Sequence, residues 1–267
     1  MKPVAFDYAR PTRMEDAVAL VAANPDAKIL AGGQTLGPML NLRLAQPALL
    51  VDITRIAELA AVREEPDAIV LGATITHAAI EDSHVPDPTH GFLSRVARGI
   101  AYRAVRSRGT IGGSLAHADP AADWLSCLTA LGAEVLVRGA QGARTLALSG
   151  FMRGAMETEL AHDELVVGIR VPKFSSRARF GYHKICRKTG EFAEAIGVAV
   201  HDPDRDLFRL VASTATGAPI VLADKAFSAD AAALQHRLTE AGPSGDTYEM
   251  NVRIAALQRA MREVRPV

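Results

Sequence analysis

Cysteine is scarce in this chain of 267 residues. Only Cys127 and Cys186 are present, and two thiols exclude both a disulfide framework and a self-contained four-cysteine zinc or iron–sulfur site. We interpret both cysteines as reduced, partly buried side chains. Chemistry that needs an iron–sulfur cluster would therefore have to be supplied by another chain.

An excess of charge and long hydrophobic runs are also missing. Thirty basic residues balance thirty acidic ones, so no broad basic field for nucleic acid is implied. The first twelve residues lack the apolar region of a signal peptide, and the longest apolar runs, within 47–51 and 68–73, are far shorter than the roughly 20 residues that span a bilayer. We expect a soluble, cytoplasmic protein with no transmembrane segment and no nucleic-acid partner.

The usual nucleotide-binding and hydrolase motifs are absent as well. The stretch GGQTLG at 32–37 is not the G-x-G-x-x-G of a Rossmann dinucleotide site. The sequence contains no G-x-x-x-x-G-K-[ST], H-E-x-x-H or G-x-S-x-G motif, which are typical of P-loop, zinc-protease and hydrolase sites. A bound dinucleotide would have to be held by a different fold.

Two glycine pairs are the most unusual feature that is present. ILAGGQTL at 29–36 and TIGGSL at 110–115 both place Gly-Gly between an apolar segment and a small polar residue. One interpretation is a tight turn after a strand. The other is anion capture, because residues without Cβ let backbone N–H groups reach a phosphate and nearby hydroxyls add donors. Either motif alone leaves both interpretations open.

The hydrophobic patterns predict an α+β chain. Strands are expected at 26–32, 47–54, 68–76 and 164–172, and on both sides of a turn within 195–214. Helices are expected at 12–25, 90–107, 225–242 and 246–264, and a helix, strand, turn and strand at 122–151. Thr12 and Thr76 are expected to cap helices. We place one domain at about 1–173 and a smaller one at about 178–267, with a linker at 173–179.

Four segments resemble one family, the FAD-binding medium subunits of molybdenum hydroxylases of the carbon monoxide dehydrogenase and xanthine dehydrogenase type. They are AGGQTLGPMLNLRLAQPALLVDITRI, RSRGTIGGSLAHADPAADW, ELVVGIRVP and YHKICRKTGEFA, and the resemblance covers nearly the whole chain. It implies a two-lobed FAD-binding domain of the vanillyl-alcohol oxidase (PCMH) type, with lobes at about 1–55 and 56–173. A small α+β flavoprotein C-terminal domain would follow at 178–267.

The resemblance also implies a set of FAD contacts. The first loop would comprise Ala31, Gly32, Gly33, Gln34, Thr35 and Leu36, and the second Thr110, Ile111, Gly112, Gly113 and Ser114. Asp123 matches a further polar contact, the Leu165–Val166 pair an apolar contact, and Lys184 and Phe192 positions beside the isoalloxazine. An aromatic ring there can stack on the flavin, and a nearby cation favours its anionic reduced forms.

The sequence departs from the family pattern just before the second loop. AYRAVRSRGT at 101–110 replaces a stretch that resembles GDPQVRNRGT in the family, and Phe192 stands where some relatives carry tyrosine. The branch of the benzoyl-CoA reductase type is disfavoured, because its extra cluster needs more cysteines than this chain has.

The resemblance implies an electron-transfer subunit. It would hold non-covalent FAD and receive electrons from the [2Fe–2S] clusters of a small subunit, while a large subunit carries the molybdenum cofactor, in a dimer of heterotrimers. The alternative is a self-contained flavin oxidase or reductase of the same fold, and a third possibility is a nucleotide-binding or assembly module without flavin. No catalytic residue and no metal site is predicted on this chain.

Other polar residues receive simpler interpretations. His117 and Asp119 could be drawn as metal ligands, but we interpret them as turn and cap residues before a helix that opens at Pro120. His77 is interpreted as a residue of a first helical turn. Whether the side chains of Arg106 and Arg108 are solvated or paired is left open.

Overall fold

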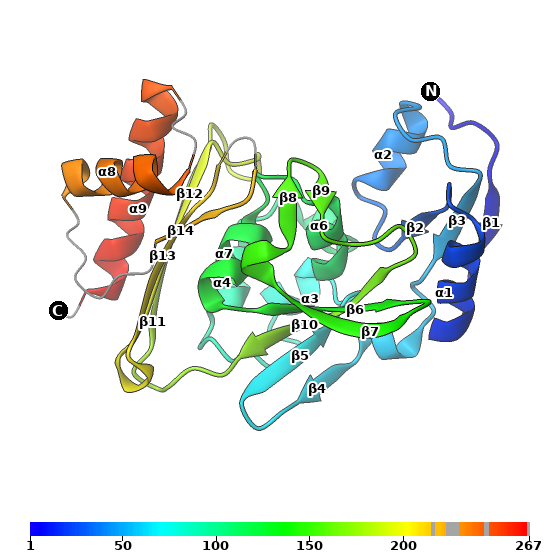
Figure 1. The fold of residues 1–267 in the computed structure, drawn as a ribbon, viewed down its shortest axis with the longest axis horizontal. Helices are drawn as coiled ribbons and strands as arrows, with labels where there is room; N and C mark the ends of the chain where they lie inside the picture. The colour runs from blue at the N-terminus through cyan, green and yellow to red at the C-terminus, as the bar shows by residue number, and fades with distance from the viewer. Residues whose placement is uncertain (215–216, 223–229, 243–245, 266–267) are drawn as a thin grey trace.

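The computed structural model describes residues 1–214, 217–222, 230–242 and 246–265. Sheets of three, five and four strands follow one another along the chain, with a two-stranded hairpin beside the middle one (Figure 1). The described part of the chain is a mixed α and β structure, as the sequence predicts. It contains no helix that is long and apolar enough to cross a membrane.

The N-terminal sheet is parallel, with strand order β1–β3–β2. Its elements are β1 (Asp7–Ala9), α1 (Met14–Ala23), β2 (Lys28–Leu30), α2 (Leu36–Asn41) and β3 (Leu49–Asp52). Helix α1 buries Met14, Ala17 and Val21 in one cluster with residues of β3. The residue before α1 is Arg13, and no side chain caps this helix end. The predicted capping by Thr12 is therefore wrong.

The middle sheet is antiparallel, with strand order β4–β5–β10–β6–β7. Its elements are η1 (Ala57–Ala60), β4 (Val62–Glu64), β5 (Ala68–Gly72), α3 (His77–Glu81), α4 (Phe92–Arg98), α5 (Arg103–Arg106), α6 (Ile111–His117), α7 (Asp123–Leu131), β6 (Glu134–Gly139), β7 (Gly142–Ala147), η2 (Leu148–Gly150), β8 (Met152–Gly154), β9 (Glu157–Thr158) and β10 (Leu165–Pro172). Strand β10 pairs with both β5 and β6. The last strand in sequence thus lies at the centre of the sheet.

The C-terminal sheet is antiparallel, with strand order β11–β12–β13–β14. Its elements are β11 (Arg179–Ile185), β12 (Ala195–Asp202), η3 (Pro203–Arg205), β13 (Leu207–Ala212), β14 (Ile220–Leu222), α8 (Ala231–Ala241) and α9 (Thr247–Val264). Helix α9 covers one face and contributes the core residues Leu257 and Met261. The predicted helix over 225–242 is seen as α8, and its first five residues lie outside the described ranges.

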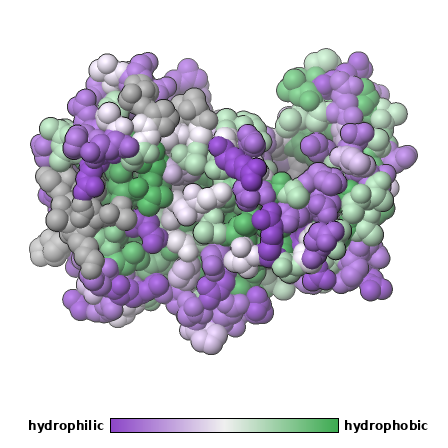
Figure 2. All heavy atoms as spheres, in the orientation of Figure 1, coloured by the Kyte–Doolittle hydropathy of each residue, from purple (hydrophilic) through white to green (hydrophobic). Residues whose placement is uncertain are grey.

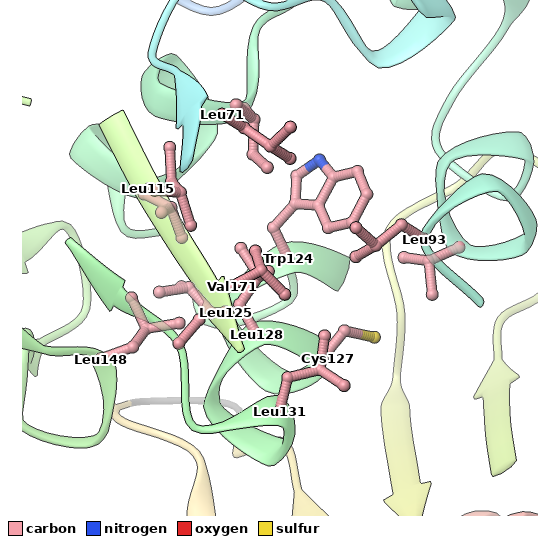
Figure 3. Close-up of a cluster of buried hydrophobic side chains, with 14 of the residues drawn as sticks. Leu71, Leu93, Leu115, Trp124, Leu125, Cys127, Leu128, Leu131, Leu148 and Val171 are labelled. Atoms are coloured by element: carbon pink, nitrogen blue, oxygen red, sulfur yellow. The ribbon is translucent and has the colours of Figure 1, made fainter. Parts of the chain in front are cut away.

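Helix α7 lies between the middle and C-terminal sheets. All nine of its residues are buried, six of them apolar and three of them polar: Asp123, Ser126 and Thr129. Trp124, Leu125 and Leu128 pack with residues of the middle sheet, such as Leu71 and Val171 (Figure 3). The same cluster contains three residues of β12: Ile196, Val198 and Val200. One continuous core therefore joins the two sheets, and the division into domains at 173/178 stays a prediction.

Helix α9 lies unusually close to the C-terminal sheet. A Cβ on Gly181 of β11 would lie 1.9 Å from the carbonyl oxygen of Ala260, and one on Gly197 of β12 would lie 2.4 Å from the carbonyl carbon of Ala256. Such distances are far inside van der Waals contact, so only glycine permits this approach. The two glycines thereby set the depth at which α9 packs on the sheet.

The predicted helix over 90–107 is broken in the structure. Helix α4 ends at Arg98, α5 begins at Arg103, and Ala101 between them has a positive φ of 42°. A continuous α-helix cannot pass through a left-handed residue. Helix α7 begins at Asp123 after Ala122, so Pro120 does not open it as predicted.

Two other local predictions are confirmed. Thr76 caps α3 by accepting a hydrogen bond from the backbone N–H of Ala79 at 3.2 Å. Cys127 and Cys186 are free thiols, the first buried and the second partly buried.

His77, the first residue of α3, connects that helix to α7. The indole Nε1–H of Trp124 donates to its Nδ1 at 3.0 Å, so the neutral ring carries its proton on Nε2. Burial, reinforced by the charge of Arg106, lowers the pKa of His77 from 6.5 to about 4. The prediction of a first-turn helix residue is confirmed, and the ring serves packing in a neutral form.

We expect Gly181→Ala and Gly197→Ala each to lower the free energy of unfolding by about 1–3 kcal/mol, the usual range for overpacking. The added methyl would force α9 away from the sheet. Denaturant unfolding measures the change. Gly150→Ala is the control, because a Cβ there would meet nothing within 4 Å. Wild-type stability of both variants would show that α9 does not contact the sheet through these glycines.

We expect acid to destabilise the fold through His77. Its folded pKa lies below that of the unfolded chain, so the unfolded state binds the proton first as the pH falls. Stability is fully present above pH 6.5 and should be lost toward pH 4, by about 3 kcal/mol from this residue. The measurement is denaturant unfolding across this range, in which His77→Asn should lose less stability than wild type. His84→Asn, at an exposed position, should keep the wild-type slope.

Candidate functional site

The first glycine pair joins β2 to α2 and lies against the second motif. A Cβ on Gly32 would lie 2.0 Å from the carbonyl oxygen of Arg108 and 2.8 Å from Cα of Gly109. Gly33 has φ of 70°, a left-handed conformation that favours glycine. Backbone therefore packs on backbone here, and this contact brings together two loops that lie almost eighty residues apart in the sequence.

The first loop presents a row of free backbone donors. The N–H groups of residues 32–36 find no acceptor within the described ranges, while Gln34 turns its side-chain amide back to the carbonyl of Gly32 at 3.2 Å. All five residues are at least partly exposed. Successive N–H groups around a left-handed residue form a concave anion site. This loop has the geometry expected for holding a phosphate.

The second glycine pair is built differently. It forms the first turn of α6, where Thr110 caps the helix by accepting from the N–H of Gly113 at 3.1 Å. The N–H groups of Ile111 and Gly112 donate to carbonyls of the segment that leads into α3, and that of Ser114 donates to Thr110. The N–H groups of residues 111–114 are therefore used within the protein, and a contact of this loop with FAD stays a prediction.

Gly112 is required for packing and not for an open phosphate approach. A Cβ at this position would lie 2.6 Å from Cβ of Ala73 and 2.7 Å from its carbonyl oxygen. Gly113 is exposed and Ser114 is partly exposed. The outer side of α6 therefore presents the hydroxyl of Ser114 beside Gly113, which has no side chain. A flat group can approach the helix closely at this glycine.

A surface notch lies between these two motifs. Helix α2, which follows the first loop, and helix α6, which contains the second, lie on opposite sides of it (Figure 1). The space-filling view shows the molecule indented at the same place, between the N-terminal sheet region and the rest (Figure 2). A ligand in this notch would contact both loops.

Asp123 and Lys184 form a buried ion pair. Nζ of Lys184 lies 3.1 Å from Oδ2 of Asp123 and 3.4 Å from the carbonyl oxygen of Gly99, and the hydroxyl of Tyr182 donates to Oδ1. Burial raises the pKa of the Asp123 carboxyl, while the Lys184 charge opposes this shift. Burial, followed by the Asp123 charge, also raises the pKa of Tyr182 far above its usual value. The structure thus connects two predicted site residues to each other across α7 and β11.

Leu165 and Val166 have side chains on opposite faces of β10. Leu165 belongs to the core of the N-terminal sheet region and Val166 to the large core around α7. Their exposures are only 1% and 6%. Both side chains therefore belong to hydrophobic cores, and a direct cofactor contact by either residue stays a prediction.

Phe192 lies on the loop between β11 and β12. Its side chain is 68% exposed, beside a hollow of about 320 Å³ that Arg187, Gly190, Glu191 and Glu194 also line. A flat ring placed here would find an aromatic face free to stack on.

The Phe192 loop, residues 186–194, packs against the break between α4 and α5. A Cβ on Gly190, whose φ is 89°, would lie 2.9 Å from the carbonyl oxygen of Ala101 and 3.3 Å from the ring of Tyr102. Tyr102 is itself 63% exposed. Two exposed aromatic side chains therefore lie on neighbouring segments.

The side chain of Arg106 is paired and not solvated, and it bonds to the break between α4 and α5. Its guanidinium forms a bidentate pair with Glu81, at 2.7 Å and 3.1 Å. It also donates to the carbonyls of Ile100 at 2.9 Å and Ala101 at 3.0 Å. Arg108 has an exposed side chain and contributes its backbone contact with Gly32. The segment that departs from the family pattern is thus held rigidly.

Tyr182, Tyr102 and Gly190 are not among the residues that the sequence predicts for the site. No strand is predicted at 179–185, where the structure has β11. Alternation along this strand puts Tyr182 on the same face as Lys184. No sequence signal marks the approach of Gly190 to Ala101, since that contact is made only in the tertiary structure.

The described residues contain no group of three or more His, Cys, Asp or Glu side chains that could hold a metal ion. Asp119 instead accepts the backbone N–H of Ala121 at 2.9 Å, which confirms its interpretation as a turn residue. His117 is the last residue of α6.

The chain matches a known domain family and several characterised enzymes. Residues 4–174 match the family described as the FAD binding domain in molybdopterin dehydrogenase. The chain is 41% identical over 201 residues to the carbon monoxide dehydrogenase medium chain of Hydrogenophaga pseudoflava, covering 75% of this chain and 70% of the relative. It is 36% identical over 225 residues to the caffeine dehydrogenase subunit beta of Pseudomonas sp. (strain CBB1), covering 82% and 76%.

A solved structure extends the similarity over the full chain. A carbon monoxide dehydrogenase from Hydrogenophaga pseudoflava, which lacks the Mo-pyranopterin moiety of the molybdenum cofactor, matches with a TM-score of 0.89 and 33% identity, over 99% of this chain and 98% of the other. The resemblance found in the sequence is therefore confirmed, with FAD as the cofactor of the matched domain. The chain belongs to the family of FAD-binding medium subunits of molybdenum-containing dehydrogenases.

Proposed function

We propose that this chain holds FAD non-covalently and carries electrons from the [2Fe–2S] clusters of a small partner subunit to an external acceptor. The observation that carries the proposal is the row of free N–H donors at 32–36. The backbone of this loop packs at Gly32 against the backbone of Arg108, which leads into the second motif. A diphosphate needs several donors and little bulk around it. The loop supplies both, so FAD fits the residues present.

The residues around the notch divide the binding of FAD between them. Residues 32–36 hold the diphosphate through backbone N–H groups, and Ser114 on α6 adds a hydroxyl. The pair of Asp123 and Lys184 supplies fixed charge. Phe192 covers the isoalloxazine ring by stacking. When bound, the flavin exchanges electrons singly or in pairs.

The partners follow from what this chain lacks. Its two cysteines cannot ligate an iron–sulfur cluster, and the described residues hold no other metal-binding group. The matched relatives are named as medium or beta subunits. We therefore assign the iron–sulfur clusters to a small subunit and the molybdenum cofactor to a large subunit, assembled as a cytoplasmic dimer of heterotrimers. The FAD domain is of the PCMH type in this proposal.

We expect Gly32→Ala to lower FAD affinity at least tenfold, because a methyl at 2.0 Å from the carbonyl oxygen of Arg108 would push the two motifs apart. Gly37→Ala is the matched control. It lies in α2 just after the first loop, and a Cβ there would meet nothing within 4 Å, so FAD should bind as in wild type. FAD titration followed by flavin fluorescence measures both. Equal affinity of the two variants would contradict the two-loop site.

We expect the chain produced alone to bind FAD but to remain yellow under anaerobic conditions with caffeine or carbon monoxide, which the named relatives oxidise. The same chain, tagged and purified from its native cells, should carry iron and molybdenum in fixed ratio to FAD. Elemental analysis and anaerobic bleaching of the flavin band measure this. A lone chain that an organic substrate bleaches rapidly would instead be a self-contained flavin oxidoreductase.

A further inference from the structure

The hydrogen bonds around Lys184 leave one of its donors unused. An ammonium group has three N–H donors, and those of Lys184 reach two acceptors in the described part of the chain, Oδ2 of Asp123 and the carbonyl oxygen of Gly99. The Lys184 side chain is only 9% exposed. The third donor is therefore available to solvent or to a ligand.

Tyr182 is the reason that this donor stays free. Its hydroxyl donates to Oδ1 of Asp123, and the ammonium of Lys184 therefore has to serve only Oδ2. Without the hydroxyl, one oxygen of a buried carboxylate would lack a donor. Lys184 is the nearest cation and would turn to bridge both oxygens.

Tyr182 is held in place independently of this bond. It lies two residues before Lys184 on β11, so both side chains project from the same face of the sheet toward α7. Its ring packs edge-on against Phe92 of α4, with centroids 6.4 Å apart. Removing only the hydroxyl should therefore leave the ring and the strand where they are.

We propose that Tyr182 is a positioning residue that keeps one N–H of Lys184 free for the bound flavin. The inference rests on the proposed function, since it takes FAD as the ligand that reaches Lys184. Tyr182 acts through Asp123 and Lys184 and does not itself touch the cofactor. A hydrogen bond from the ammonium stabilises added negative charge on the flavin, which raises the midpoint potential.

The test is the midpoint potential of FAD bound to the full chain, measured by anaerobic redox titration. We expect Tyr182→Phe to shift the potential to more negative values, by no more than Lys184→Met does. In the Lys184→Met background, Tyr182→Phe should produce no further shift, since its effect is transmitted through the ammonium. The matched control is Tyr8→Phe, which removes the bond from an exposed tyrosine to the buried Asp52 of the N-terminal sheet and should leave the potential unchanged.

A second measurement observes Lys184 itself in the wild-type chain. In wild-type chain labelled with ¹⁵N-lysine, addition of FAD should shift the Nζ resonance of Lys184, assigned by its loss in Lys184→Met. An unmoved resonance with FAD bound would overturn this inference alone, as would a wild-type potential in Tyr182→Phe. A full further shift of the midpoint potential when Tyr182→Phe is added to Lys184→Met would also overturn it. Failure of the wild-type chain to bind FAD would overturn the proposed function as well.

Discussion

The enclosure of α7 between two sheets is the constraint on which the rest of the molecule depends. The middle sheet and the C-terminal sheet both pack on this helix, so neither can move without exposing its side chains. Burying one such large apolar side chain contributes about 1.5–3 kcal/mol. The helix also begins with Asp123, so its position places a buried carboxylate where β11 can supply Lys184 and Tyr182. Stability and the chemistry of the site thus share one element.

Glycine serves three separate purposes in the site. Gly32 and Gly112 admit neighbouring backbone or a neighbouring methyl, while Gly33 adopts a left-handed conformation that leaves the surrounding N–H groups unpaired. The third purpose belongs to Gly190, which lets the Phe192 loop rest on the break after α4. The two motifs look alike in sequence, yet only the first presents free donors, because the second is the capped start of a helix.

Charge at the site is fixed by pairs and not by single residues. Lys184 is balanced by Asp123, and Arg106 by Glu81. Each pair connects two different secondary-structure elements, α5 with α3 and β11 with α7. Because both pairs are largely buried, solvent and salt screen them less than surface charges. An electron-carrying cofactor placed beside them would experience a constant field.

The sequence by itself determined the α+β composition, most strands and helices, the exclusion of a self-contained four-cysteine site, and the resemblance that identifies the family. Local patterns suffice for these, since periodicity, glycine pairs and cysteine number are properties of short segments or of composition. Only the tertiary structure decided that Gly32 meets Arg108, that Asp123 pairs with Lys184, and that Tyr182 completes the pair. These contacts join residues 59–76 positions apart, and such distant pairings are fixed by how sheets and helices pack and not by any local signal.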